Sequence, residues 1–432
     1  MKSVKFRKFS VILYWLIFIA LLCLYFTNDF GLMDIHKTSI VVAVGIDSEG
    51  EEVKVTAQLA IPQPSQSGEG VKYSAVQGSG ITVADALNEI NSKTGFFPKL
   101  LFCNLVLMGE SCQKLNLFKT MGCLYRKYFS ELTANVAMCK GNAYDMLQMN
   151  AMYSQEPSDA ILQVLADEAK RSANVSAVDL KDIALDNYSK SQACYMPYIE
   201  AIKSGTSASG GNGDSSGGDP AQSPEGGSGE SSGGISGGDS SGGQEGGSGG
   251  GSSGGRSSGG GQSQEVEFTA RKTAIFRDGE FAGILDEAQS FALDILKNGI
   301  RVAMLPCDAE GKHNTMALKG VKGGVELKVD KGVPKLIISV KSQTRIQGSA
   351  EKVNPAKTVS DDIVSKEVLK ATEKALKDRI EQLIAVCREK DCDLLGAKDQ
   401  LHRFNFKYYD AFKDDLLSRM QVEYDIKIVS VS

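Results

Sequence analysis

A Gly/Ser-rich stretch at residues 204–263 constrains the fold of this 432-residue chain more than any other feature. It holds more than half of the chain's 46 glycines, lacks aromatic residues and contains only Thr206 and Ile235 as β-branched residues. Such a segment cannot bury enough apolar surface to offset the entropy lost on folding, which predicts a disordered linker. The folded material must therefore lie on either side, at residues 31–203 and 264–432. A flexible coil of this length would also let the two regions move separately.

The linker accounts for the net charge of the chain. It is acidic, with a charge of −5, which is also the net charge of all 432 residues. Basic and acidic residues are therefore equal in number outside it. This balance leaves no basic surface in bulk, so we expect no nucleic-acid partner.

The amino terminus has the pattern of a membrane anchor or signal segment, at residues 1–30. Basic residues up to Lys8 precede an uncharged run from Phe9 to Phe26, long enough for a helix of about 27 Å that crosses a hydrocarbon core. The basic flank predicts that the rest of the chain is exported. An uncleaved anchor is favoured, because no small-residue cleavage site follows the run. Lipidation of Cys23 is the alternative, although Leu22 stands where a lipoprotein has a small residue.

Chemical motifs are scarce in this sequence. The nine cysteines are odd in number, lack a C-x-x-C pair and lie within apolar runs, so we expect small buried hydrophobes, with one or two disulfides left open. The three histidines, His36, His313 and His402, are isolated, which argues against a metal site. We therefore predict no catalytic, cofactor or metal-ligand residues, and no enzyme.

Hydrophobic periodicity predicts a mixed α/β fold (α+β-like) on both sides of the linker. Before it, strands are expected at 40–46, 53–61, 71–79, 100–108, 134–139 and 195–201, with helices from 82 and at 116–127, 143–150, 159–172 and 178–190. After it, a hairpin at 266–285 precedes a helix at 287–297, strands at 300–305, 315–322, 325–329 and 335–345, a long helix at about 360–390 and a strand at 422–430. A further subdomain split near residue 345 is an option.

Two acidic clusters and one aromatic cluster are candidate sites. The first acidic cluster, around Asp47 and Gly50, does not have the spacing of a calcium loop and predicts the solvated tip of a hairpin. The second, Glu389, Asp391 and Asp393, is expected to cap and solvate the exit of the long helix. The aromatic group predicts either core packing under the C-terminal sheet or a partner surface; its candidate residues are Arg403, Phe404, Tyr408, Tyr409 and Phe412.

Five ordered blocks of this sequence resemble a known family. They are VVAVGIDSEGEEVKVTAQLAIPQP, TVADALNEINSKTGFFPKLLFCNLVLMGE, YMPYIE, TAIFRDGEFAGILDEAQS and DCDLLGAKDQLHRFNFKYYDAF. Together they resemble the Ger(x)C family, the C subunit of spore germinant receptors. Two features depart from the family pattern: the weak lipidation motif at Cys23 and the Gly/Ser insertion.

The resemblance implies a function. It implies a membrane-associated, non-enzymatic subunit of a nutrient germinant receptor, facing outward from the inner membrane of the spore. The expected partners are the multi-spanning receptor subunits and the membrane, with a nutrient ligand also open. The alternatives are an extracytoplasmic solute-binding protein and an envelope hydrolase. The family's motifs carry the fold rather than chemistry, so the resemblance names no catalytic residue.

Overall fold

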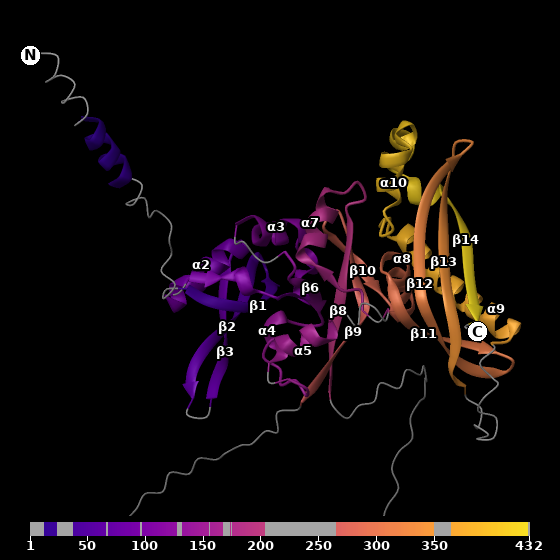
Figure 1. The fold of residues 1–432 in the computed structure, drawn as a ribbon, viewed down its shortest axis with the longest axis horizontal. Helices are drawn as coiled ribbons and strands as arrows, with labels where there is room; N and C mark the ends of the chain where they lie inside the picture. The colour runs from indigo at the N-terminus through magenta and orange to yellow at the C-terminus, as the bar shows by residue number, and fades with distance from the viewer. Residues whose placement is uncertain are drawn as a thin grey trace, which may run out of the picture. The chain divides into compact units, whose positions relative to one another are not determined.

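The computed structural model describes residues 13–23, 38–65, 68–95, 97–127, 132–154, 156–166, 173, 175–203, 265–349 and 364–430 (Figure 1). The predicted linker and most of the predicted anchor lie outside these residues. Residues 13–23 form a helix with exposed side chains. No helix among the described residues is long and apolar enough to span a membrane.

The larger sheet follows the order β10-β9-β8-β6-β5-β1-β2-β3. Its central strands β1, β5, β6 and β8 run parallel to one another, and its outer pairs are antiparallel. Two short strands, β4 (Phe97–Lys99) and β7 (Val178–Asp179), pair with β1 and β6. The eight strands are β1 (Thr38–Glu49), β2 (Glu52–Ser65), β3 (Gly68–Gly80), β5 (Leu105–Gly109), β6 (Asn135–Cys139), β8 (Ala193–Lys203), β9 (Val266–Arg277) and β10 (Glu280–Leu285).

The Gly/Ser stretch connects two strands that lie side by side. β8 pairs with β9 in antiparallel register from Ala193↔Arg277 to Lys203↔Val266. The first two strands after the stretch therefore complete the sheet that the residues before it begin. The expectation that the two regions move separately is wrong for β8, β9 and β10, because their backbones share one hydrogen-bonded ladder.

Helices cover both faces of the larger sheet. Alternate residues of β5 and β6 point to opposite sides. Val106 and Met138 join a core with the helices α2 (Val83–Thr94), α3 (Leu117–Lys127) and α7 (Leu180–Tyr188), whereas Leu107 and Ala137 join one with α4 (Ala143–Met146) and α5 (Pro157–Val164). The predicted strand at 100–108 is shorter than expected, because Leu100–Phe102 form a 3₁₀ turn, η2.

The smaller sheet has the order β11-β12-β13-β14 and follows α8 (Glu287–Lys297). α8 and α9 (Lys366–Glu389) pack on one side of it, sharing a core with β11 (Ile300–Ala309), β12 (Lys312–Asp330), β13 (Val333–Ser349) and β14 (Gln421–Ser430). The prediction of two strands at 315–322 and 325–329 is wrong. β12 is continuous across a register shift between Lys319 and Lys322, where Gly320 has φ +56°.

Most of the cysteines are buried packing residues, as the sequence predicts. None of the nine is in a disulfide, and seven are buried. Burial raises the pKa of the Cys103 and Cys387 thiols to about 12, so both stay protonated at neutral pH.

The acidic block at residues 47–52 is a hairpin tip, but Asp47 is not part of its solvated surface. Gly50 takes φ +64° between the paired Glu49 and Glu52, which confirms the hairpin. Asp47 is buried, and its carboxylate accepts hydrogen bonds from the backbone N–H groups of Ala143 (2.8 Å) and Tyr144 (3.0 Å). The carboxylate therefore satisfies donors at the start of α4, which is the structural reason for G-I-D.

Candidate functional site

The C-terminal aromatic group lies on three short elements in succession. These are α10 (Ala397–Phe404), the 3₁₀ turn η5 (Phe406–Tyr408) and α11 (Tyr409–Phe412). Asp393 starts α10 by accepting hydrogen bonds from the N–H groups of Ala397 (2.9 Å) and Lys398 (2.7 Å). The expectation that Asp393 solvates the exit of the long helix is wrong, because this carboxylate is buried and caps the next helix.

Hydrogen bonds hold α10 to β12 and to the residues that precede β8. Gln400 donates to Val325 O (2.9 Å) and accepts from Leu327 N–H (2.7 Å), both on β12. At the helix start, the Ser191 hydroxyl before β8 lies between Asp393 Oδ2 (2.6 Å) and Asp399 Oδ2 (2.8 Å). Burial raises the pKa of Asp393 above its usual range, although the hydrogen bonds from Ser191 and the backbone oppose that shift. The aromatic side chains are thus presented on a fixed support.

The aromatic rings divide into a packed set and an exposed set. Tyr408, Tyr409 and Phe412 are half-buried and pack against the core shared by α9 and the smaller sheet. Phe404 and Phe406 are 69% and 64% exposed. The sequence left core packing and an exposed surface open for the aromatic group, and each description fits some of its rings. A role in partner binding stays a prediction.

Ring contacts and cations organise the exposed part. The His402 ring centroid lies 5.3 Å from that of Phe406 and 4.8 Å from that of Tyr409, both edge to face. The Arg403 guanidinium carbon lies 5.9 Å from the Phe404 ring centroid, and Lys407 Nζ lies 4.7 Å from that of Tyr408. Exposed rings rimmed by cationic groups are typical of protein-binding hot spots. We call Arg403, Phe404, Phe406 and Lys407 the aromatic surface.

The sequence prediction omitted Phe406 from the candidate set. Its three-residue spacing to Tyr409 is the helical spacing that places two rings on one face, and the two rings do stack, with centroids 6.5 Å apart. That spacing was the available indication. Exposure could not be read from it, because the sequence does not show which of the two rings faces the core.

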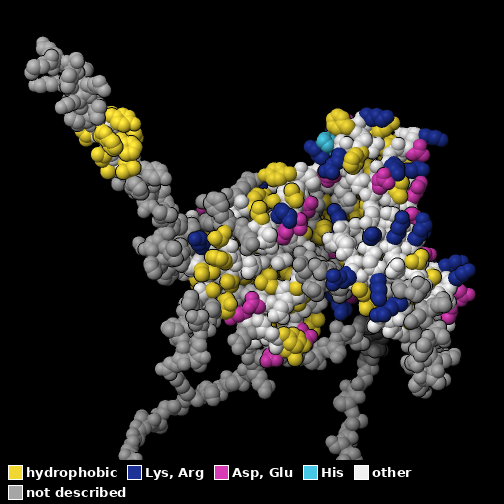
Figure 2. Space-filling model, in the orientation of Figure 1, with side chains coloured by type: hydrophobic (Ala, Val, Ile, Leu, Met, Phe, Trp, Pro, Cys, Tyr) yellow, Lys and Arg dark blue, Asp and Glu magenta, His cyan; other side chains and the backbone are white. Residues whose placement is uncertain are grey.

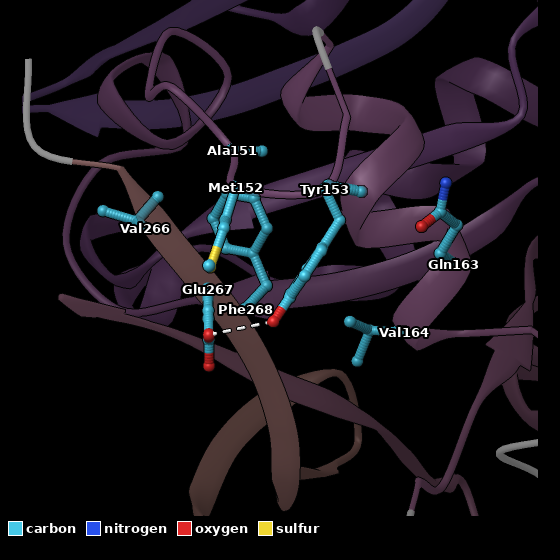
Figure 3. A pocket seen from close by; sticks show the side chains of 9 residues that line it. Ala151, Met152, Tyr153, Gln163, Val164, Val266, Glu267 and Phe268 are labelled. Carbon is cyan, nitrogen blue, oxygen red and sulfur yellow. Dashed lines mark hydrogen bonds between the residues drawn. The ribbon is translucent and has the colours of Figure 1, made fainter. Parts of the chain in front are cut away.

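A second candidate is a pocket beside the start of β9 (Figure 3). Its volume is about 240 Å³, and α5 contributes Gln163 and Val164 to its wall. Figure 3 shows Tyr153 and Glu267 turned toward each other, and the Tyr153 hydroxyl donates a hydrogen bond to Glu267 Oε1 (3.2 Å). Apolar side chains around one carboxylate could hold a small molecule with a cationic group.

Metal ligation and the lipidation of Cys23 are the remaining chemical candidates. No group of three His, Cys, Asp or Glu side chains in the described ranges could hold a metal ion. His313 Nδ1 instead contacts Asp308 Oδ1 at 2.7 Å. Cys23 is exposed at the end of the helix at 13–23, and its lipidation stays a prediction.

The chain is similar to known spore germination proteins. Residues 32–201 match the family model described as "Spore germination protein N-terminal domain", and residues 271–431 match "Spore germination B3/GerAC like, C-terminal". The Bacillus subtilis (strain 168) protein YfkR, named for spore germination, is 22% identical over 206 residues. That match spans 45% of this chain and 51% of YfkR, about half of its length. The crystal structure of the GerBC protein superposes with a TM-score of 0.48 and 13% identity, over 92% of this chain and 100% of that one.

Proposed function

Because the chain belongs to the GerAC-like family of spore germination proteins, we propose that it is a membrane-associated, non-enzymatic subunit of a nutrient germinant receptor. The observation that carries this proposal is the match of both domain models, in order, on either side of the Gly/Ser stretch. The subunit acts with multi-spanning receptor subunits to trigger germination. Its exported part faces outward from the inner membrane of the spore.

The family blocks support this proposal through what they do in the structure. Gly109 ends β5, and a Cβ atom there would lie 1.9 Å from Asp47 Oδ1. The neighbouring Glu110 accepts hydrogen bonds from Gly141 N–H (3.1 Å) and Tyr198 O–H (3.0 Å). These family residues are thus occupied in holding β1, β5, β8 and α4 together. A family whose marker residues build the fold suits a binding subunit rather than an enzyme.

Membrane association is supported by the sequence of the first 30 residues. The basic residues before the apolar run and the length of that run are those of an anchor. Within this proposal the aromatic surface is where the exported part meets a receptor subunit. It combines exposed rings, a neighbouring arginine and a rigid support on β12, which are the properties of an interface centre.

A gene deletion tests the function directly. Spores of the deletion strain should form normally and fail to germinate in at least one nutrient, and the intact gene should restore the response. A gene carrying Phe404→Ser and Phe406→Ser should restore it poorly, whereas the matched surface change Lys370→Ser on α9 should restore it fully. Normal germination in every nutrient, in a strain that lacks paralogous genes, would contradict the proposal.

Direct nutrient binding is the second candidate function, and the pocket of Figure 3 is the observation that favours it. In this case Glu267 would hold the amino group of an amino acid against the apolar wall made by Met152 and Phe268. Calorimetry of the detergent-purified protein against amino acids and sugars measures this. Binding that Glu267→Gln removes, and that Glu287→Gln leaves, would assign the nutrient site to this chain.

A further inference from the structure

Three lysines stand directly opposite one another on the smaller sheet. Lys322 of β12 pairs with Lys341 of β13 in antiparallel register, and Lys341 pairs with Lys427 of β14 in parallel register. All three are exposed. Like charges directly opposite each other in a sheet destabilise it, so this row is costly to the free protein.

Two of the three lysines in the row, Lys322 and Lys341, have no carboxylate partner among the described residues, whereas Lys427 has one. Two lysines elsewhere on these strands do have carboxylate partners: Lys328 Nζ lies 3.0 Å from Glu326 Oε2, and Lys335 Nζ lies 3.1 Å from Glu423 Oε1. Lys427 Nζ lies 2.9 Å from Asp425 Oδ1. Within the described ranges, no carboxylate lies within ion-pair distance of Lys319, Lys322 or Lys341.

The row forms one wall of an open groove of about 540 Å³. Lys319, on the other side of the register shift in β12, also lines the groove, as do Gln343 and Val429. Lys319 and Gln343 are paired residues on the same face. Lys and Arg side chains gather over this part of the molecule in the space-filling view (Figure 2). Four amines therefore converge on a cavity that holds no carboxylate in its lining.

Exposed apolar side chains accompany the lysines. Val429 is 54% exposed within the groove, and Met304 of β11 is 46% exposed. Met304 pairs with Ala317, two residues from Lys319, and so belongs to the same face. A broad, open sheet face with amines and scattered apolar groups fits the interface of a bilayer better than it fits a free anion, which prefers an enclosed site.

We propose that the outer face of β12, β13 and β14 binds the phosphate headgroups of anionic phospholipids through Lys319, Lys322 and Lys341. Phosphate oxygens that lie between the amines attract them and so offset the repulsion between the lysines. Each lysine near an anionic membrane surface contributes about 1 kcal/mol to binding. The inference deepens the proposed function, since it requires the exported part to lie on the membrane. It fixes which face of the smaller sheet turns toward that membrane.

Residue-resolved lysine acetylation, read by mass spectrometry, tests this in the full-length protein. The protein is reconstituted in phosphatidylcholine vesicles with or without phosphatidylglycerol. Lys322 and Lys341 should be acetylated about fivefold more slowly when phosphatidylglycerol is present, the factor that corresponds to about 1 kcal/mol. Exposed Lys370 and Lys374 on α9 serve as internal references and should not change. High salt should abolish the protection, because these charges are exposed to solvent.

Variants and competing ligands distinguish lipid headgroups from other molecules that could occupy the groove. Lys322→Gln should weaken the protection of Lys341, whereas Lys370→Gln should not. Equal acetylation in both vesicles would overturn the proposal. The proposal would also be overturned if Lys322 and Lys341 were protected from acetylation in phosphatidylcholine vesicles by inorganic phosphate alone or by an acidic receptor subunit. The same holds if the acidic residues 204–263 protect them, which deletion of these residues would show. Failure of the protein to float with phosphatidylcholine vesicles contradicts the proposed anchor instead, and phosphatidylglycerol-dependent flotation would then still support the groove.

Discussion

The pairing of β8 with β9 makes a strong prediction about the Gly/Ser stretch. Lys203 and Val266 are register partners, so their strands could be joined by a tight turn. We expect a chain in which residues 204–265 are replaced by a four-residue Asn-Gly turn to fold as before. It should also be more stable, because closing a shorter loop costs less entropy.

The size of the effect follows from the two loop lengths. For a flexible coil, the closure cost changes as 1.5 RT times the logarithm of length, so going from about 60 residues to four stabilises the fold by about 2.4 kcal/mol. For a folded body of this size, the corresponding rise in Tm is about 3 °C. The gain requires the strands to be adjacent in the folded state. A stretch linking two separate bodies would give no gain.

Thermal unfolding followed by circular dichroism measures this in purified protein. A control chain with 204–263 replaced by neutral Gly/Ser of equal length should keep the wild-type Tm, which isolates loop length from charge. If the shortened chain loses its cooperative transition, or its Tm falls by several degrees, the pairing of β8 with β9 is wrong and the two regions are separate bodies.

Two further substitutions test the interior. Gly109→Ala should lower the free energy of unfolding by about 3 kcal/mol, because its Cβ would displace the Asp47 carboxylate from two backbone hydrogen bonds. The control Gly122→Ala, whose Cβ meets nothing closer than 3.5 Å, should not destabilise the protein. Equal Tm values for the two variants would refute this explanation of Gly109. Burial raises the pKa of Asp294 from 3.8 to about 7. Between pH 4 and pH 7 the unfolded chain therefore ionises this carboxyl while the folded protein keeps it protonated, so the free energy of unfolding falls as the pH rises and stops falling above about pH 7. Asp294→Asn cannot ionise and should show a smaller fall in Tm between pH 5 and pH 8 than the wild type; an identical fall would refute this assignment.

Local patterns in the sequence were enough to predict much of the fold. α8 begins and ends where expected, because Asp286 and Gln289 form a reciprocal cap and the apolar face is continuous up to Lys297. The hairpin of β9 and β10 follows from strict alternation around a turn at Asp278 and Gly279, both with positive φ. These features depend only on neighbours in the chain.

Features that depend on distant partners could not be predicted. Gly323 and Gly324 indicated a break in β12, but Gly323 lies where a Cβ atom would meet Ile295 O of α8 at 2.0 Å, so it marks close helix packing instead. Asp47 looked solvated because its partners lie 96 residues away. The lysine row is likewise invisible in the sequence, where charges balance outside residues 204–263, since strand register alone creates it.

We propose above all that this chain is a binding subunit that engages a multi-spanning receptor subunit through its aromatic surface. Quantitative co-purification of the co-expressed receptor subunits with the full-length chain tests it most directly. The wild-type chain should retain a multi-spanning subunit. The double variant Phe404→Ser, Phe406→Ser should retain about tenfold less or lower, as expected for hot-spot rings, while its Tm stays within a degree or two because both rings are exposed. Equal retention by the double variant, or no multi-spanning partner with the wild type, would contradict the claim.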